Sequence, residues 1–259
     1  VAITTTKDSC VSYNVSGTLC TNCQNYVLST KDMTTVQPDG LELVSALARG
    51  PVEDVLVSRE GLSLSELPQG ARVATGSQRR RAQLLKQRPD LEITNLRGNV
   101  QTRLAKITDG AADATVMARA GLVRMGLDAH ITEILPLNEF VPAVSQGIVG
   151  LVCRADDEET KKALRAIGDP DAWAAALCER AFLRTLQGGC SAPIGGHARV
   201  ASGGEALSLH GIVLAPDGAR SVEGRLAGPL HDAESLGVRL AEDLIEQGAA
   251  EILESARDV

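Results

Sequence analysis

The chain has 259 residues, a net charge of −7 and only 2% aromatic residues. This length allows a sizeable core and two or three compact units, and that core must be built from Ala, Val, Leu and Ile. The acidic balance argues against general binding to nucleic acid or to membrane surfaces. No apolar run approaches the roughly 20 residues of a spanning helix, so we expect a soluble protein.

Residues 1–28 are rich in Thr, Ser, Asn and Cys and show no periodicity that would assign them a structure. Cys20 and Cys23 have the spacing of a metal knuckle, but Cys10 is the only other candidate nearby. Because a structural zinc site needs four ligands, we predict no metal. The six cysteines lack a disulfide-type spacing, which favours a reducing compartment: the cytoplasm, or a plastid in an alga or plant.

From Ser29 onward a charged pair, Lys31-Asp32, precedes a turn at 38–40 and a strand-like segment, VLVS, at 55–58. Residues 71–124 then alternate between strand-like and helical segments. The strands are expected at 71–75, 91–96 and 113–118, and the helices at 78–88, 99–107 and 120–124. This alternation predicts an α/β unit with a mostly parallel sheet.

A basic cluster lies within this unit: eight basic residues and two acidic ones occur between Arg79 and Lys106. The first of them open a helix, where the macrodipole disfavours cations, so we expect an anion to bind there. Arg97 and Arg103 follow different strand ends, which predicts that the charges converge on one crevice. A solvated face and a phosphate-backbone site are the alternatives.

The C-terminal part begins with a helix capped by Asp156 or Asp157 and a second, longer helix that starts at Pro170. Three strands follow within 197–228, with turns at 203–204 and 217–218. One amphipathic helix over 233–253 closes the chain and should bury its leucines, Leu236, Leu240 and Leu244. These elements predict a small α+β unit.

Cys190 follows the long helix directly after Gly188 and Gly189. Two glycines allow a left-handed helix end, so the thiol should lie on a short exposed loop. A thiol there suits nucleophilic or covalent work, whereas most lone cysteines are small buried hydrophobes.

The segment GGCSAPIGGHA around Cys190 resembles the cofactor-attachment loop of the porphobilinogen deaminase (hydroxymethylbilane synthase) family. TGSQRR, LRGNVQTR, AGLVR and PAVSQG are similar to further motifs of that family, and KDMTT to its KDxPT loop. The resemblance covers about residues 29–256. It implies two doubly wound, periplasmic-binding-protein-like α/β domains, the first incomplete, and a small α+β C-terminal domain. The implied domains are 1–52 with 146–166, then 53–145, and 167–259 with the cofactor cysteine.

The resemblance also implies the chemistry: four porphobilinogen molecules are joined head to tail with loss of ammonia, giving hydroxymethylbilane. Cys190 would carry a dipyrromethane cofactor through a thioether, and Asp32 would be the catalytic acid/base and the stabiliser of a cation. The residues that would bind the cofactor and substrate are Lys31, Thr75, Ser77, Arg79, Arg80, Arg97, Arg103 and Arg124.

Two family motifs, ATRxSxLALxQ and GGKGLF, are not found before Ser29. We therefore expect an incomplete first domain, and a catalytically impaired member or a non-catalytic anion-binding module stays open beside the active enzyme. A nucleic-acid binder is disfavoured because few aromatic residues are available for stacking on bases. We expect a monomer whose partner is porphobilinogen.

Overall fold

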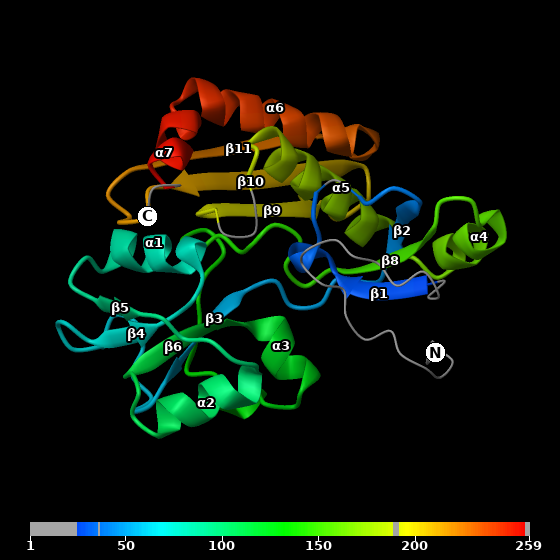
Figure 1. Ribbon diagram of the computed structural model, residues 1–259. Coiled ribbons are helices and arrows are strands. Elements are labelled where there is room, and N and C mark those ends of the chain that lie inside the picture. Colours follow the sequence, from blue (N-terminus) through cyan, green and yellow to red (C-terminus); the bar gives the residue numbers. More distant parts are fainter. Residues whose placement is uncertain (1–24, 36, 189–191, 257–259) are drawn as a thin grey trace.

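The computed structural model describes residues 25–35, 37–188 and 192–256, which form three sheets with their helices (Figure 1). The N-terminal sheet is antiparallel, in the order β1-β8-β2. Its strands are β1 (Asn25–Ser29), β2 (Leu41–Ala46) and β8 (Val149–Arg154), and it is followed by α4 (Glu158–Ala166). Asp157 caps α4 by accepting a hydrogen bond from the Thr160 amide, as one of the two expected caps.

The central sheet has five strands in the order β5-β4-β6-β3-β7. They are β3 (Asp54–Ser58), β4 (Arg72–Ala74), β5 (Glu92–Thr94), β6 (Ala114–Ala118) and β7 (Glu133–Ile134); the helices are α1 (Gln78–Gln87), α2 (Val100–Thr108) and α3 (Arg119–Arg124). β4 runs parallel to β5 and β6, whereas β3 is antiparallel to β6 and β7. The sheet is thus more mixed than expected, because the 59–71 connection contains no helix that could carry the chain back for a parallel pairing.

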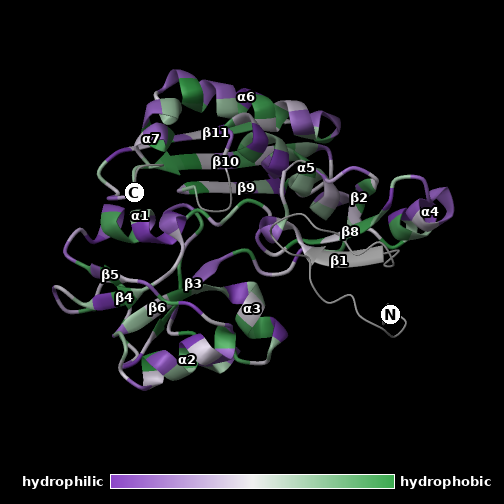
Figure 2. Cartoon of the chain, in the orientation of Figure 1, coloured by the Kyte–Doolittle hydropathy of each residue, from purple (hydrophilic) through white to green (hydrophobic). Residues whose placement is uncertain are grey.

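The C-terminal sheet is antiparallel, in the order β11-β10-β9. Its strands are β9 (Ile194–Val200), β10 (Ala206–Leu214) and β11 (Ser221–Pro229); the helices are α5 (Pro170–Thr185), α6 (Ala233–Glu246) and α7 (Ala249–Ser255). α6 alternates between hydrophobic and hydrophilic residues along its ribbon (Figure 2), and its three predicted leucines are buried. The expected single final helix is wrong: Gly248 takes a φ of 100° and separates α6 from α7.

Two segments connect the N-terminal and central sheets: the first crossing, residues 47–53, and the second crossing, residues 135–148. They lie against each other, because the Gly50 amide donates to the Gly147 carbonyl at 2.9 Å. Gly147 has a φ of 82°, and a Cβ there would lie 2.8 Å from the Gly50 oxygen. Only glycine fits both the backbone and this close approach.

The α/β class and the small α+β C-terminal unit are confirmed by this arrangement. α1 packs on the C-terminal sheet, where Ala82 shares a buried cluster with Ile212 and Leu214. None of the helices in the described ranges is long and apolar enough to cross a membrane. The exact domain boundaries stay a prediction.

Candidate active site

A cavity of about 330 Å³ lies where the N-terminal sheet, the central sheet and the second crossing meet. Lys31 and Asp32 enter it from the 3-10 turn η1 (Thr30–Asp32), and Gln146 from the second crossing. Its other charged lining residues are Arg80, Arg103 and Arg124. Four cations and the Asp32 carboxylate therefore share one small space, which suits an anionic ligand with a region of positive charge.

The turn that carries Lys31 and Asp32 is fixed at its start by Thr30. This residue is buried, its amide donates to the Ile148 carbonyl at 3.2 Å, and its hydroxyl donates to the same oxygen at 2.9 Å. Burial of Lys31 and, next, the charge of Arg80 lower the pKa of its ammonium group. Asp32 itself is exposed, so its carboxylate is accessible from the cavity.

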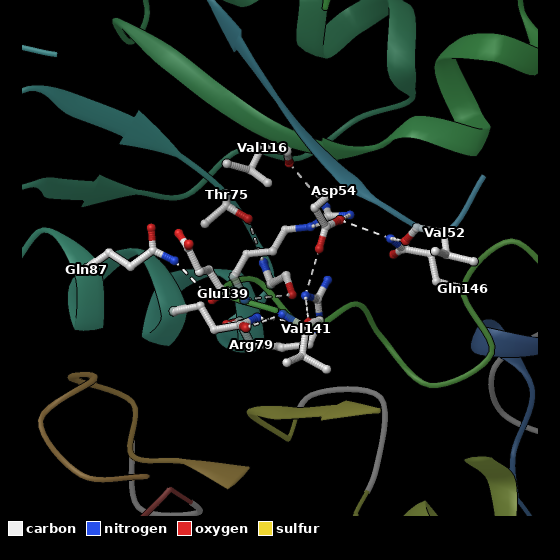
Figure 3. Close-up of polar contacts among 12 residues, drawn as sticks. Val52, Asp54, Thr75, Arg79, Gln87, Val116, Glu139, Val141 and Gln146 are labelled. Atoms are coloured by element: carbon white, nitrogen blue, oxygen red, sulfur yellow. Dashed lines mark hydrogen bonds and ion pairs between the residues drawn. The ribbon is translucent and has the colours of Figure 1, made fainter. Parts of the chain in front are cut away.

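Arg79 and Arg80, at the start of α1, are paired with a buried carboxylate of the chain itself. Asp54, the first residue of β3, has Oδ2 2.7 Å from Arg79 Nη1 and Oδ1 2.7 Å from Arg80 Nη2. Gln146 Nε2 donates to the same Oδ1 at 3.2 Å, and Figure 3 shows Asp54 between Arg79 and Gln146. Burial acts to raise the pKa of Asp54, but the two arginines outweigh it and hold the pKa at about 2.

This network changes the expected role of the helix-start arginines. The negative group that they require is Asp54, so their position alone does not demand an external anion. Arg79 lies behind the cavity, 4% exposed, and also donates to the Val141 carbonyl at 2.7 Å. Arg80 borders the cavity with its side chain 9% exposed. Sequence reasoning missed Asp54, although an acidic residue at the start of an apolar strand was a signal of a buried ion pair.

Thr75, Ser77 and Arg97 do not line the cavity. The Thr75 hydroxyl accepts from the Ser77 amide at 3.2 Å, and the Ser77 hydroxyl caps α1 by accepting from the Arg80 amide. Arg97 is exposed, so the expected convergence of the whole basic cluster does not occur. Of the cluster, Arg80 and Arg103 reach the cavity; Lys86 and Arg88 pair instead with Glu223 and Asp90.

Arg103 and Arg124 come from α2 and α3, which border the cavity together with α1. Arg103 Nε donates to the Gly98 carbonyl at 2.8 Å, which fixes the side chain along the start of its helix. Burial and the nearby Arg80 charge lower the pKa of the Arg103 guanidinium. Arg80 and Arg103 are therefore close enough to repel each other, and an anion bound between them would relieve that repulsion.

Cys190 lies outside the described residues, as do Cys10, Cys20 and Cys23. The helix before it ends at Thr185, and the expected left-handed position falls on Gln187, with a φ of 52°, not on Gly188, whose amide donates to the Leu183 carbonyl at 3.1 Å. Cys153 and Cys178 are free and buried. Burial and the Glu179 charge raise the pKa of Cys178 to about 12, so this thiol is not reactive. No cluster able to hold a metal occurs in the described part of the chain.

Comparison with known protein families identifies the family to which this chain belongs. The family model for the dipyromethane cofactor binding domain of porphobilinogen deaminase matches residues 17–162, and the model for its C-terminal domain matches 173–246. The chain belongs to the porphobilinogen deaminase family. Its relatives include the porphobilinogen deaminase of Syntrophobacter fumaroxidans, 44% identical over 88% of this chain and 73% of that one. That of Rubrobacter xylanophilus is 46% identical over 90% of this chain and 75% of that one.

The cofactor of this family is a dipyrromethane, and the side chains around the cavity fit such a group. The carboxylates that the family's cofactor is expected to carry pair best with guanidinium and ammonium donors, and the cavity offers three of the former and one of the latter. Arg103, Arg124 and Lys31 line the cavity and would hold those carboxylates.

Proposed function

We propose that this chain is a porphobilinogen deaminase that joins four porphobilinogen molecules head to tail and releases ammonia, giving hydroxymethylbilane. The observation that carries the proposal is the cavity in which Asp32 faces four cations, within a chain 44–46% identical to porphobilinogen deaminases. The cations would bind the acidic side chains of the substrate, and Asp32 would act on its reacting end.

Loss of ammonia leaves positive charge on the substrate's methylene carbon, and attack by a pyrrole carbon then displaces a proton. We assign Asp32 both tasks: its carboxylate stabilises the cation before attack and accepts the proton afterwards. The surrounding arginines hold the two reactants in line, which removes part of the entropic cost of bringing them together. The dipyrromethane, attached at Cys190, would supply the pyrrole that begins the chain.

Asp54 has a supporting role in this proposal. It fixes Arg79 and Arg80 by ion pairs, and it is itself fixed by Gln146, which also donates to the Val52 carbonyl at 2.7 Å. Arg80 would thereby present one face to the cavity without moving. Thr75 and Ser77 would shape the turn before α1 rather than bind substrate.

The test is turnover of purified protein. Incubation with porphobilinogen should release ammonia and a tetrapyrrole that closes to a porphyrinogen, and the intact mass should exceed the sequence mass by one dipyrromethane. Replacement of Cys190 by Ser should remove the adduct and the activity. An unmodified Cys190 in protein from a host that makes porphobilinogen would favour a non-catalytic anion-binding module.

We further propose that the protein is a monomer of the cytoplasm or of a plastid, with no nucleic-acid or membrane partner. The cations around the cavity do not form an exposed stripe, which supports carboxylate ligands over phosphodiesters. A steep fall in DNA affinity with rising salt concentration would contradict this.

A further inference from the structure

The loop that carries Lys31 and Asp32 is held at two points. Thr30 fixes its start to the second crossing through the Ile148 carbonyl. Its end, residues 34–35, is held by Arg180, a residue of α5 in the C-terminal unit. Arg180 Nη2 donates to the Thr34 carbonyl at 2.7 Å and to the Thr35 carbonyl at 3.2 Å.

Arg180 is only 6% exposed, so folding removes most of the water around its guanidinium, which is unfavourable unless hydrogen bonds replace that water. A buried guanidinium is retained only when its donors are well used. Here two of its hydrogen bonds go to backbone oxygens that lie 146 and 145 residues away in the sequence. Backbone acceptors cannot be exchanged by substitution, so the contact fixes the path of the loop whatever its side chains are.

Between the two anchors the chain is short. Met33 is buried, and its amide donates to the Thr30 carbonyl at 3.3 Å, which closes the turn. Asp32 is therefore an exposed residue between a buried Thr30 and a buried Met33. Its carboxylate can hold one position over the cavity only if both ends of this turn are held.

The neighbouring residue on α5, Glu179, contacts both crossings: it pairs with Arg49 of the first and accepts from the Ser145 amide of the second. One turn of α5 thus contacts both crossings, the second of which borders the cavity, and also the loop that carries Asp32. We propose that Arg180 is a positioning residue, which fixes the Asp32 loop at the cavity from the C-terminal unit. In its catalytic consequence this inference rests on the function proposed above.

The test compares Arg180→Met, which keeps the length of the side chain but removes its donors, with Arg180→Lys, which keeps one charged donor group. Arg184→Met is the matched control: it lies one turn further along α5, its side chain is 44% exposed, and it pairs with Glu234 at 3.7 Å. Amide hydrogen exchange at Thr30 and Met33 reports the loop directly and does not require turnover.

We expect Arg180→Met to speed exchange at these two amides about tenfold, with Arg180→Lys between it and the parent and Arg184→Met unchanged. The kcat of Arg180→Met should fall about tenfold to a hundredfold, since misplacement of a catalytic group by about 1 Å has effects of this size. KM should stay within about twofold, and the mass adduct should remain.

Unchanged exchange at Thr30 and Met33 in Arg180→Met would overturn the proposal, whatever happens to activity. So would loss of the mass adduct without a change in exchange, because Arg180 would then serve the cofactor loop instead. If the parent protein does not turn over, the proposed function fails by itself and the exchange comparison still decides the role of Arg180.

Discussion

Arg49 and Glu179, 130 residues apart, form an ion pair in which Nη1 lies 2.8 Å from Oε1. The Glu179 carboxylate is fully buried and also accepts hydrogen bonds from the amides of Ser145 and Ala198. Burial raises the pKa of Glu179, and Arg49 acts against that rise. One carboxylate therefore joins both crossings to β9 of the C-terminal sheet.

Replacing Glu179 by Ala should lower the free energy of unfolding by about 3–5 kcal/mol, because the largely covered Arg49 would lose its partner and the amides of Ser145 and Ala198 would lose their acceptor. Urea unfolding followed by circular dichroism measures this. Glu234→Ala is the control: its pair with Arg184 is exposed, and the change should stay within about 0.5 kcal/mol. Equal effects of the two substitutions would contradict the assigned role of Glu179.

Replacing Asp32 by Asn keeps the size of the side chain and removes its charge. If Asp32 stabilises the substrate cation, kcat should fall by roughly two orders of magnitude or more. Asp32→Glu should lose less, and both variants should keep the mass adduct. Chain extension by Asp32→Asn at the parent rate would make Asp32 a structural loop residue.

Replacing Asp54 by Asn leaves Arg79 and Arg80 buried without a carboxylate. We expect a loss of about 3–5 kcal/mol in the free energy of unfolding and a higher KM for porphobilinogen. Arg88 and Asp90 form a half-buried pair away from the cavity, so Asp90→Asn is the control, with a smaller loss of stability and no change in KM. Because the pKa of Asp54 is lowered from 3.8 to about 2, the folded pair should stay ionised to about pH 2, and its contribution to stability should be lost as the pH falls from 3.8 to 2.

His197 should make the protein less stable in mild acid. Burial, and then the charge of Arg49, lower its pKa from 6.5 to about 4. The unfolded chain therefore binds a proton that the folded chain does not, so stability falls as the pH decreases from 6.5 to 4. The loss is at most about 3 kcal/mol. The free energy of unfolding should be measured between pH 6.5 and 4 for the parent and for His197→Gln, and it should decline more steeply in the parent. Equal slopes for the two proteins would show that His197 does not cause the decline.

The local elements could be predicted because their signals lie within a few residues. Ser77 caps α1 and Asp157 caps α4, each through the amide three residues later. The division of the last helix was missed because a single glycine in a helical pattern does not show whether it takes a left-handed φ, as Gly248 does.

The site was harder to predict, because its contacts join distant segments. The basic residues of α1 indicated a missing negative charge, and Asp54 at the start of an apolar strand indicated a buried ion pair. Nothing in the sequence linked the two, because Asp54 lies 26 residues before Arg80. Arg180 gave no signal for a similar reason: its acceptors are backbone oxygens, which every residue has. Family motifs pointed to residues that line the cavity and also to Thr75, Ser77 and Arg97, which do not. Only the folded chain separates Arg80, which borders the cavity, from the buried Arg79, which does not line it.

The pairing of β1 with β8 determines when the site can form during synthesis. Tyr26 lies opposite Val152, so the N-terminal sheet cannot close until its middle strand has left the ribosome. The ribosome adds about 5–20 residues per second, so β8 is synthesised on the order of ten seconds after β1. The central sheet, whose strands lie between 54 and 134, is complete before then. The cavity wall formed by Arg80, Arg103 and Arg124 should therefore be in place first, and Asp32 should arrive at a surface that is already folded.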